Sequence, residues 1–182
     1  MKNRKFELIK CAPQTEPITL EYAPISFKDT VKVKKLHPNA ILPTYGSEYA
    51  AGADLYACID RVDGPIVDFY EILPHETLKI STGLAMEIPN KMFGAIYARS
   101  GLATREGLRP ANCVGVVDAD YRGEIIVAVH NDSDETRIIS NGDRIAQIIF
   151  QPFYRPEDGF EEVDTLSETA RGNGGFGSTG KN

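Results

Sequence analysis

The chain has 182 residues, which is the usual length of one domain, so a single hydrophobic core is expected. Hydrophobic residues make up 42% of the chain and charged residues 25%, as in globular proteins and unlike disordered ones. The 20 basic and 26 acidic residues give a net charge of −6. Because a protein that binds a nucleic-acid backbone normally carries an excess of basic residues, no stable nucleic-acid binding is expected.

Cysteine usage and hydropathy indicate the compartment. Cys11, Cys58 and Cys113 are widely spaced, form no CxxC motif and have no metal-ligand spacing to a histidine, so we interpret them as free thiols of a reducing compartment. The charged residues within 1–7 do not resemble a secretory signal. The longest apolar runs, such as 125–129, reach only about five residues, far short of a membrane span. We therefore predict a cytoplasmic protein with no membrane contact.

Short strand patterns separated by turns dominate the chain. Residues 1–30 contain three prolines and are interpreted as an N-terminal extension of unknown role, followed by a β core over residues 31–155. Strand-like patterns occur at 31–34, 77–80, 84–88, 124–130 and 145–150. Residues typical of turns occur between them at 63–65, 89–90 and 141–142. The last two strands are rich in isoleucine and valine on both faces, as expected of strands buried on two sides. Many short strands with regular turns predict an all-β sandwich or barrel.

One short helix and a terminal arm complete the expected organisation. The segment 100–106 is predicted to be helical, with Ser100 as N-cap and Gly107 as C-terminal stop. After residue 155 the chain is acidic and then glycine-rich, so residues 156–182 are predicted to be a mobile C-terminal arm. The arginine, aromatic ring and hydroxyl groups of residues 171–180 have no use in a simple linker.

Four further segments combine glycine with polar residues at strand ends, where the backbone can approach a ligand closely. These segments are 51–55, 99–103, 115–123 and 142–147. Each has an ordinary structural explanation when it is taken alone, such as a turn acid for Asp54 or a surface ion pair for Arg99. A single segment therefore identifies no function.

Taken together with the glycine-rich tail, these segments resemble, in order and content, the five motifs of the trimeric dUTPase family. The resemblance covers residues 31–180 and is most specific at 115–123 and 171–180. It implies a jelly-roll fold and hydrolysis of dUTP to dUMP and pyrophosphate, which limits uracil incorporation into DNA and supplies dUMP. The family usually has proline where this chain has Ala98, and the stretch 60–70 is longer here, which we interpret as a longer hairpin away from the chemistry.

The resemblance implies roles for the residues on the nucleoside side. In the family, the aspartate that matches Asp118 positions and deprotonates the water that attacks the α-phosphorus, and a carboxylate ionised at neutral pH can accept this proton. The ring of Tyr121 would lie under the deoxyribose and exclude a 2′-hydroxyl by shape. Asn112 and the backbone of the hairpin that contains Gly115 and Val117 would bind the uracil edge.

On the phosphate side, the segment Arg99, Ser100 and Gly101 resembles the phosphate-binding motif, and Gln147 resembles the glutamine of the fourth motif. Asp54 resembles the first-motif aspartate, which supports the site and the water around the metal. The resemblance implies Mg²⁺ as cofactor, held by phosphates and water rather than directly by side chains, as is common for this ion.

The resemblance also implies a role for the arm and a partner for the chain. Arg171 would bind the γ-phosphate region and Phe176 would stack over the uracil. Ser178 and Thr179 would bond phosphate oxygens, with Gly177 allowing close approach. In the family each site draws on all three subunits, so a homotrimer with shared active sites is implied.

Two alternatives stay open at the level of the sequence. A dCTP deaminase, or a bifunctional deaminase and dUTPase, shares the fold and the trimer but needs a general acid/base carboxylate at the pyrimidine C4. A regulatory protein could instead use the nucleotide as a signal, through residues 1–30 or 60–70. The segment 118–123 favours the hydrolase.

Overall fold

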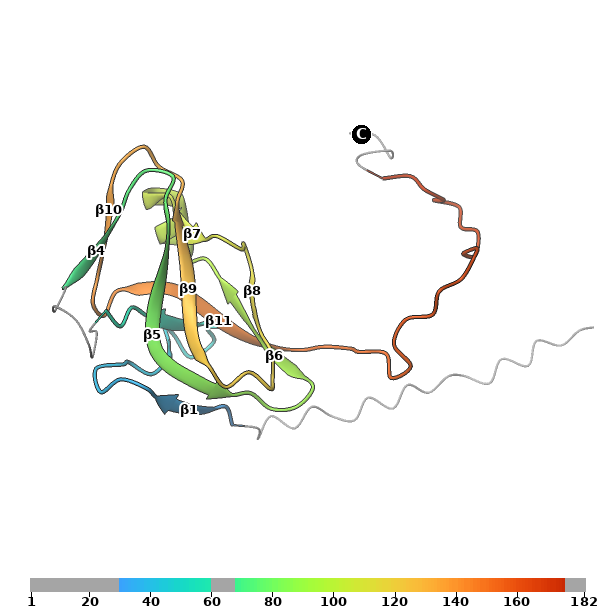
Figure 1. Ribbon diagram of the computed structural model, residues 1–182, viewed down its shortest axis with the longest axis horizontal. Coiled ribbons are helices and arrows are strands. Elements are labelled where there is room, and N and C mark those ends of the chain that lie inside the picture. The colour runs from blue at the N-terminus through green and yellow to red at the C-terminus, as the bar shows by residue number, and fades with distance from the viewer. Residues whose placement is uncertain (1–29, 60–67, 176–182) are drawn as a thin grey trace, which may run out of the picture. The chain divides into compact units, whose positions relative to one another are not determined.

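The regular structure of the chain is nearly all β-strand (Figure 1). The computed structural model describes residues 30–59 and 68–175. The strands are β1 (Lys32–Lys35), β2 (Thr44–Tyr45), β3 (Ala53–Tyr56), β4 (Phe69–Ile72), β5 (Thr77–Glu87), β6 (Met92–Tyr97), β7 (Leu108–Pro110), β8 (Gly115–Val117), β9 (Glu124–Asn131), β10 (Arg137–Ser140) and β11 (Arg144–Pro152). A short π-helix, η1 (Leu102–Glu106), lies between β6 and β7. The all-β prediction is confirmed.

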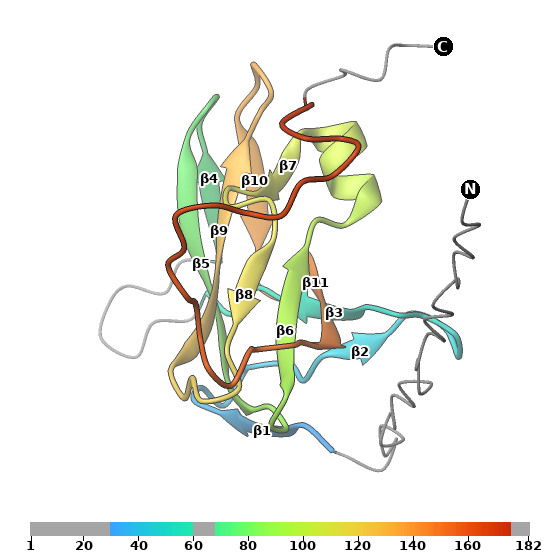
Figure 2. The same ribbon diagram turned by 90° about the vertical axis from the view of Figure 1, so that its right-hand side faces the viewer.

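The strands of the described residues form antiparallel sheets. One sheet has the order β1-β5-β9-β7, a second has the order β2-β3-β11-β6-β8, and β4 pairs with β10 in a two-stranded sheet. Figure 2 shows β8 and β6 of the second sheet beside β9 of the first. Two antiparallel sheets around one core form the predicted jelly-roll-like sandwich.

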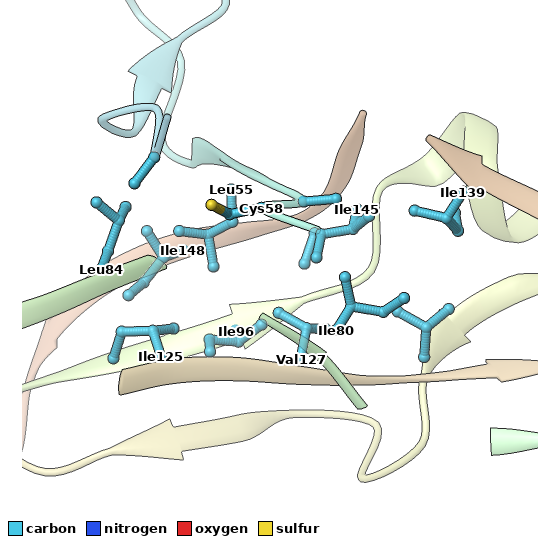
Figure 3. Packing of buried hydrophobic residues seen from close by; sticks show 14 of the residues in the cluster. Leu55, Cys58, Ile80, Leu84, Ile96, Ile125, Val127, Ile139, Ile145 and Ile148 are labelled. Atoms are coloured by element: carbon cyan, nitrogen blue, oxygen red, sulfur yellow. The ribbon is translucent and has the colours of Figure 1, made fainter. Parts of the chain in front are cut away.

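The hydrophobic core lies between the two larger sheets. Leu55, Ile145 and Ile148 of the five-stranded sheet belong to the same buried cluster as Ile80 and Val127 of the four-stranded sheet (Figure 3). None of these five residues is more than 2% exposed. Burying an aliphatic side chain of this size contributes about 1.5–3 kcal/mol, so this layer holds the strands whose ends carry the polar segments.

Strand β9 is buried on one face, which corrects the expectation of burial on two sides. Ile125, Val127 and Val129 are buried, whereas Ile126 on the opposite face is 45% exposed. An antiparallel sandwich gives each strand one inner face, and only helices or a second chain would cover the outer one. The outward residues of β11 are half-buried, so this strand comes closer to the expectation.

The helical segment begins at residue 100, as predicted, with residues 100–101 in α-helical conformation directly before η1. The element η1 makes no side-chain cap hydrogen bond, so the capping role expected for Ser100 is wrong. The reason is that the Ala103 amide donates to the Arg99 carbonyl at 2.9 Å, which already encloses residue 100 in the first helical turn. The predicted stop is confirmed: Gly107 has a φ of 71°, and its N–H donates to the carbonyl of Leu102.

The predicted turns at 89–90 and 141–142 separate strands as expected, and Gly142 adopts a φ of 83° that favours glycine.

Among the described residues, no helix has both the length and the apolar character needed to cross a membrane.

Some predicted features lie outside the described residues. These are residues 1–29 of the N-terminal extension with Cys11, and residues 60–67 with the predicted turn at 63–65. The last two residues of the lengthened stretch, Phe69 and Tyr70, belong to β4, which pairs with β10 and not with a strand adjacent in sequence.

Asn131 joins separate backbone segments at the end of β9. The residue is fully buried, and its Nδ2 donates to the carbonyl of Ile72 at 3.0 Å and to that of Glu135 at 2.8 Å. Its Oδ1 accepts a hydrogen bond from the Ser133 backbone N–H at 3.0 Å. One side chain therefore bonds to backbone groups at the end of β4 and in the loop after β9.

We predict that Asn131→Ala lowers the free energy of unfolding by about 1–3 kcal/mol, because it leaves buried carbonyls without donors. Asp134→Ala is the matched control in the same loop, since the Asp134 side chain is 96% exposed, and its effect should stay within about 0.5 kcal/mol. Urea denaturation of both variants measures the difference. Equal effects would show that the Asn131 bonds contribute little.

Candidate active site

A first cavity lies between β8 and β9, and five of the residues singled out from the sequence line it. It has a volume of about 260 Å³, and we call it the β8 cavity. The five residues are Asn112, Gly115, Val117, Asp118 and Tyr121. The structure therefore brings together the residues that the sequence assigned to the nucleoside outside the C-terminal arm.

The edge position of β8 shapes this cavity. In the described part of the chain β8 pairs only with β6, which leaves the other side of its backbone unpaired. A Cβ at Gly115 would lie 3.2 Å from Ile96 Cβ and 3.3 Å from Asn112 Nδ2. Glycine at this position thus allows the Asn112 amide to lie close to the start of the strand. Free peptide groups and a nearby amide can bind the polar edge of a planar ligand.

The turn after β8 is held by its own hydrogen bonds. The Tyr121 amide donates to the Asp118 carbonyl at 3.1 Å. Arg122 Nη1 donates to the carbonyls of Ala119 at 2.6 Å and of Tyr121 at 3.0 Å. The carboxylate of Asp118 is exposed and has no hydrogen-bond or ion-pair partner among the described residues. It is therefore free to accept a proton from a ligand or from water.

A second cavity lies at the ends of β3, β6 and β11. It has a volume of about 450 Å³, and we call it the Arg99 cavity. The sequence-predicted residues that line it are Asp54, Arg99, Ser100, Gly101 and Gln147. The phosphate residues predicted outside the C-terminal arm are therefore also assembled, but in a cavity that shares no lining residue with the first.

Asp54 binds two arginines in the Arg99 cavity. Its Oδ1 lies 2.8 Å from Arg99 Nε and its Oδ2 lies 3.2 Å from Arg144 Nη1. The Asp54 side chain is 14% exposed, so water screens these ion pairs less than it would at the surface. Two guanidinium groups against one carboxylate leave a positive charge that is suited to an anion.

Gln147 is positioned by strand pairing and by a glycine. Its backbone lies opposite Asp54 on β3 and Tyr97 on β6, and its Nε2 donates to the Ala98 carbonyl at 2.9 Å. A Cβ at Gly52 would lie only 2.4 Å from Gln147 Oε1. Any side chain at residue 52 would therefore displace the Gln147 amide from the cavity.

Two arginines of this cavity were missed at the level of the sequence. Arg144 lies within the segment 142–147 that was singled out, and its basic charge beside Gln147 was a usable signal. Arg105 lies in η1, and a Cβ at Gly101 would meet its Nη2 at 2.7 Å, so its guanidinium lies over the start of the helix. With Arg105 and Glu106 included, three arginines and two carboxylates line the cavity, so the excess of positive charge remains.

Of the predicted arm residues the structure describes only Arg171, which lines neither cavity. Arg171 is exposed, and its Nε donates to the Gly174 carbonyl at 2.9 Å. Phe176, Gly177, Ser178 and Thr179 lie outside the described residues. Their expected roles are therefore not tested by the structure.

Comparisons with known proteins identify relatives over most of the chain. A model of the dUTPase family matches residues 38–180. A deoxyuridine 5'-triphosphate nucleotidohydrolase of Desulfitobacterium hafniense is 50% identical over 140 residues, which cover 76% of this chain and 87% of that protein. A protein of the same name from Escherichia phage T5 is 43% identical over 150 residues, which cover 82% of this chain and 98% of that protein.

The fold has similar solved structures as well. A variant of the Staphylococcus bacteriophage 80alpha dUTPase with dUpNHpp matches with a TM-score of 0.71 at 26% identity. The match covers 84% of this chain and 99% of that chain.

Proposed function

The chain belongs to the dUTPase family and hydrolyses dUTP, and we propose that its two cavities bind opposite ends of this substrate. The β8 cavity takes the deoxyuridine and the Arg99 cavity takes the phosphates. The observation that carries the proposal is the sorting of the polar residues. The amide, the free edge of β8 and the tyrosine line one cavity, and the guanidinium groups line the other.

The nucleoside end is selected by shape and by hydrogen bonds. The unpaired backbone of β8 and the Asn112 amide present donors and acceptors to the uracil edge. The amino group of cytosine would leave them mismatched, and such a mismatch is costly where water is excluded. The Tyr121 ring supports the deoxyribose and leaves no room for a 2′-hydroxyl.

Asp118 is proposed as the general base. Its carboxylate lines the β8 cavity without a protein partner, so it can bind a water molecule and orient it toward the α-phosphorus. The water oxygen forms a bond to the α-phosphorus as its proton passes to Asp118. The bond from the α-phosphorus to the bridging oxygen breaks, and pyrophosphate leaves.

The phosphate end is bound by groups that are already in place. Arg99 and Arg144 are fixed by Asp54, and Ser100 adds a hydroxyl at the start of the helical turn. Gln147 presents its amide at the same cavity. Fixed cations of this kind stabilise the charge that develops on the leaving pyrophosphate without reorganisation.

Magnesium fits this chain as an ion that the substrate carries. Among the described residues no group of three His, Cys, Asp or Glu side chains could form a metal site. Both oxygens of Asp54 bind arginines, so its contact to the ion would pass through water. Because Mg²⁺ usually keeps several waters and binds phosphate oxygens, we propose that it is held by the triphosphate and neutralises part of its charge.

A homotrimer with shared sites is supported by the separation of the two cavities. A single dUTP molecule needs both sets of residues, yet on one chain these sets line cavities without a common residue. Ile126 on the outer face of β9 is 45% exposed and lines the β8 cavity, where a second chain could approach it. We propose that the β8 cavity of one subunit and the Arg99 cavity of another form one site.

The structure offers little support for a deaminase. The carboxylates that line the β8 cavity are those of Asp118 and Glu124. Glu124 Oε1 accepts a hydrogen bond from the Gly83 N–H at 2.8 Å, so this carboxylate is engaged with the strand β5.

We also propose that the protein acts in the cytoplasm, where an exposed free thiol such as that of Cys113 stays reduced.

Asp118→Asn should reduce kcat by about 10²–10⁴-fold and leave the Kd of a non-hydrolysable dUTP analogue nearly unchanged, because the amide keeps the shape and loses the base. Asp120→Asn is the matched control in the same turn, since Asp120 does not line the β8 cavity. Pyrophosphate release and calorimetry measure the two quantities. An equal kcat for both variants would remove Asp118 from the mechanism.

Shared sites predict complementation between two inactive variants. Asp118→Asn disables the β8 cavity and Arg99→Ala disables the Arg99 cavity, so homotrimers of either variant have no intact site. The trimers from an equimolar refolding should together recover about a quarter of the wild-type activity, because about one site in four combines two intact cavities. Native mass spectrometry confirms mixing. Mixed trimers without activity would show that each site lies within one chain.

Deletion of residues 171–182 should abolish most of the activity without changing the free energy of unfolding. The described residues 171–175 are mostly exposed, and their hydrogen bonds stay within the C-terminal segment. Phe176→Ala should cost about 1–3 kcal/mol of substrate binding, the scale of a base–aromatic stack. Phe160→Ala, at a residue that is 98% exposed, is the control. An unchanged kcat/KM after the deletion would show that the segment is only a linker.

A further inference from the structure

The ring of Tyr121 is tethered to the main chain of its own hairpin. Its hydroxyl donates a hydrogen bond to the Glu124 carbonyl at 3.0 Å. The residue is 46% exposed and lines the β8 cavity. One end of the side chain is therefore fixed through the backbone, and the other is fixed by the phenol oxygen. The ring has a defined orientation before any ligand arrives.

The tether requires the absence of a side chain at residue 123. A Cβ on Gly123 would lie 2.4 Å from Tyr121 Oη, 2.6 Å from Cζ and 3.0 Å from Cε2. Non-bonded heavy atoms do not approach so closely, so the ring could not keep this position over an alanine. The φ of Gly123 is not among the positive values of the chain, so space and not backbone conformation explains the glycine.

The acceptor of the tether is fixed to the neighbouring strand. Glu124 Oε1 accepts a hydrogen bond from the Gly83 N–H at 2.8 Å, which ties residue 124 to β5. Gly83 has a φ of 66°, and a Cβ there would lie 2.8 Å from Ala40 Cβ, so this part of β5 is tightly packed. The carbonyl that holds Tyr121 therefore has a fixed position in the core sheet.

We infer that Gly123 and Glu124 are positioning residues for sugar selection. They hold the Tyr121 ring in the position and orientation in which it admits a deoxyribose and excludes a ribose. The inference rests on the proposed role of Tyr121 in the β8 cavity. A ring that is free to tilt would make room for a 2′-hydroxyl, whereas a tethered ring cannot yield to it. A displacement of about 1 Å is enough to change rates by up to about 100-fold.

The test compares dUTP with UTP for four variants of the full-length protein. Gly123→Ala displaces the ring, and Tyr121→Phe keeps the ring but removes its tether. Tyr121→Ala removes the ring, and the fourth variant combines Tyr121→Ala with Gly123→Ala. The measured quantity is the ratio of kcat/KM for dUTP to kcat/KM for UTP, with urea denaturation as the check on folding.

Gly123→Ala should lower this ratio about 10- to 100-fold, mainly through a higher kcat/KM for UTP, and Tyr121→Phe should lower it less. In the Tyr121→Ala background Gly123→Ala should have no further effect on the ratio, because the ring through which it acts is gone. A purely structural role would reduce the rates for both substrates equally and leave the ratio unchanged.

Three outcomes would overturn the inference. If Tyr121→Ala lowers the ratio but Gly123→Ala and Tyr121→Phe do not, the tether has no role, and the proposed function of Tyr121 stands. If Gly123→Ala lowers the ratio as much in the Tyr121→Ala background as in the wild type, its effect does not pass through the ring. If Tyr121→Ala itself leaves the ratio unchanged, the proposed sugar platform fails together with its tether. If Gly123→Ala does not fold, the result for Tyr121→Phe decides.

Discussion

The antiparallel pairing of β11 with both β3 and β6 is the constraint on which the Arg99 cavity, the proposed phosphate end of the site, depends. This pairing sets Gln147 opposite Asp54 on one side and opposite Tyr97 on the other. Arg99, two residues beyond Tyr97, then reaches Asp54, and so does Arg144 at the start of β11. Residues separated by up to 90 positions in the sequence meet because one central strand fixes the register of two others.

The same sheet also explains why the site is divided. Strand β6 pairs with β11 on one side and with the edge strand β8 on the other. Its C-terminal end leads into the Arg99 cavity, while Ile96 lines the β8 cavity. A strand presents alternate residues to opposite faces, so one strand can serve two cavities without joining them. In the proposed function, a substrate that needs both cavities then requires a second copy of the chain.

The sequence predicted the parts of the site that are local. Asp118 and Tyr121 are three residues apart in one turn, and Asn112 and Gly115 lie just before it, so a short segment contained most of the β8 cavity. The role of Arg144 depended on the long-range contact with Asp54, which no local pattern reports. The capping role of Ser100 was predicted wrongly, because a serine at the start of a helix indicates a cap only where the backbone has not already turned, and residue 100 is itself helical. The all-β fold followed from period-two alternation, but the one-sided burial of β9 depended on which layers surround it.

Charge and space act in the two cavities in the same way, by fixing groups before the substrate binds. Asp54 places its two oxygens on two arginines and so holds both guanidinium groups without cancelling their combined charge. If the carboxylate were absent, the two like charges would repel each other, and their long side chains would lose their order. In the β8 cavity the Glu124 carbonyl and the missing side chain of Gly123 fix the position of the Tyr121 ring, as Asp54 fixes the arginines. In the proposed function, selectivity and rate both depend on groups that need not reorganise when dUTP binds, because the free-energy cost of ordering them was met when the chain folded.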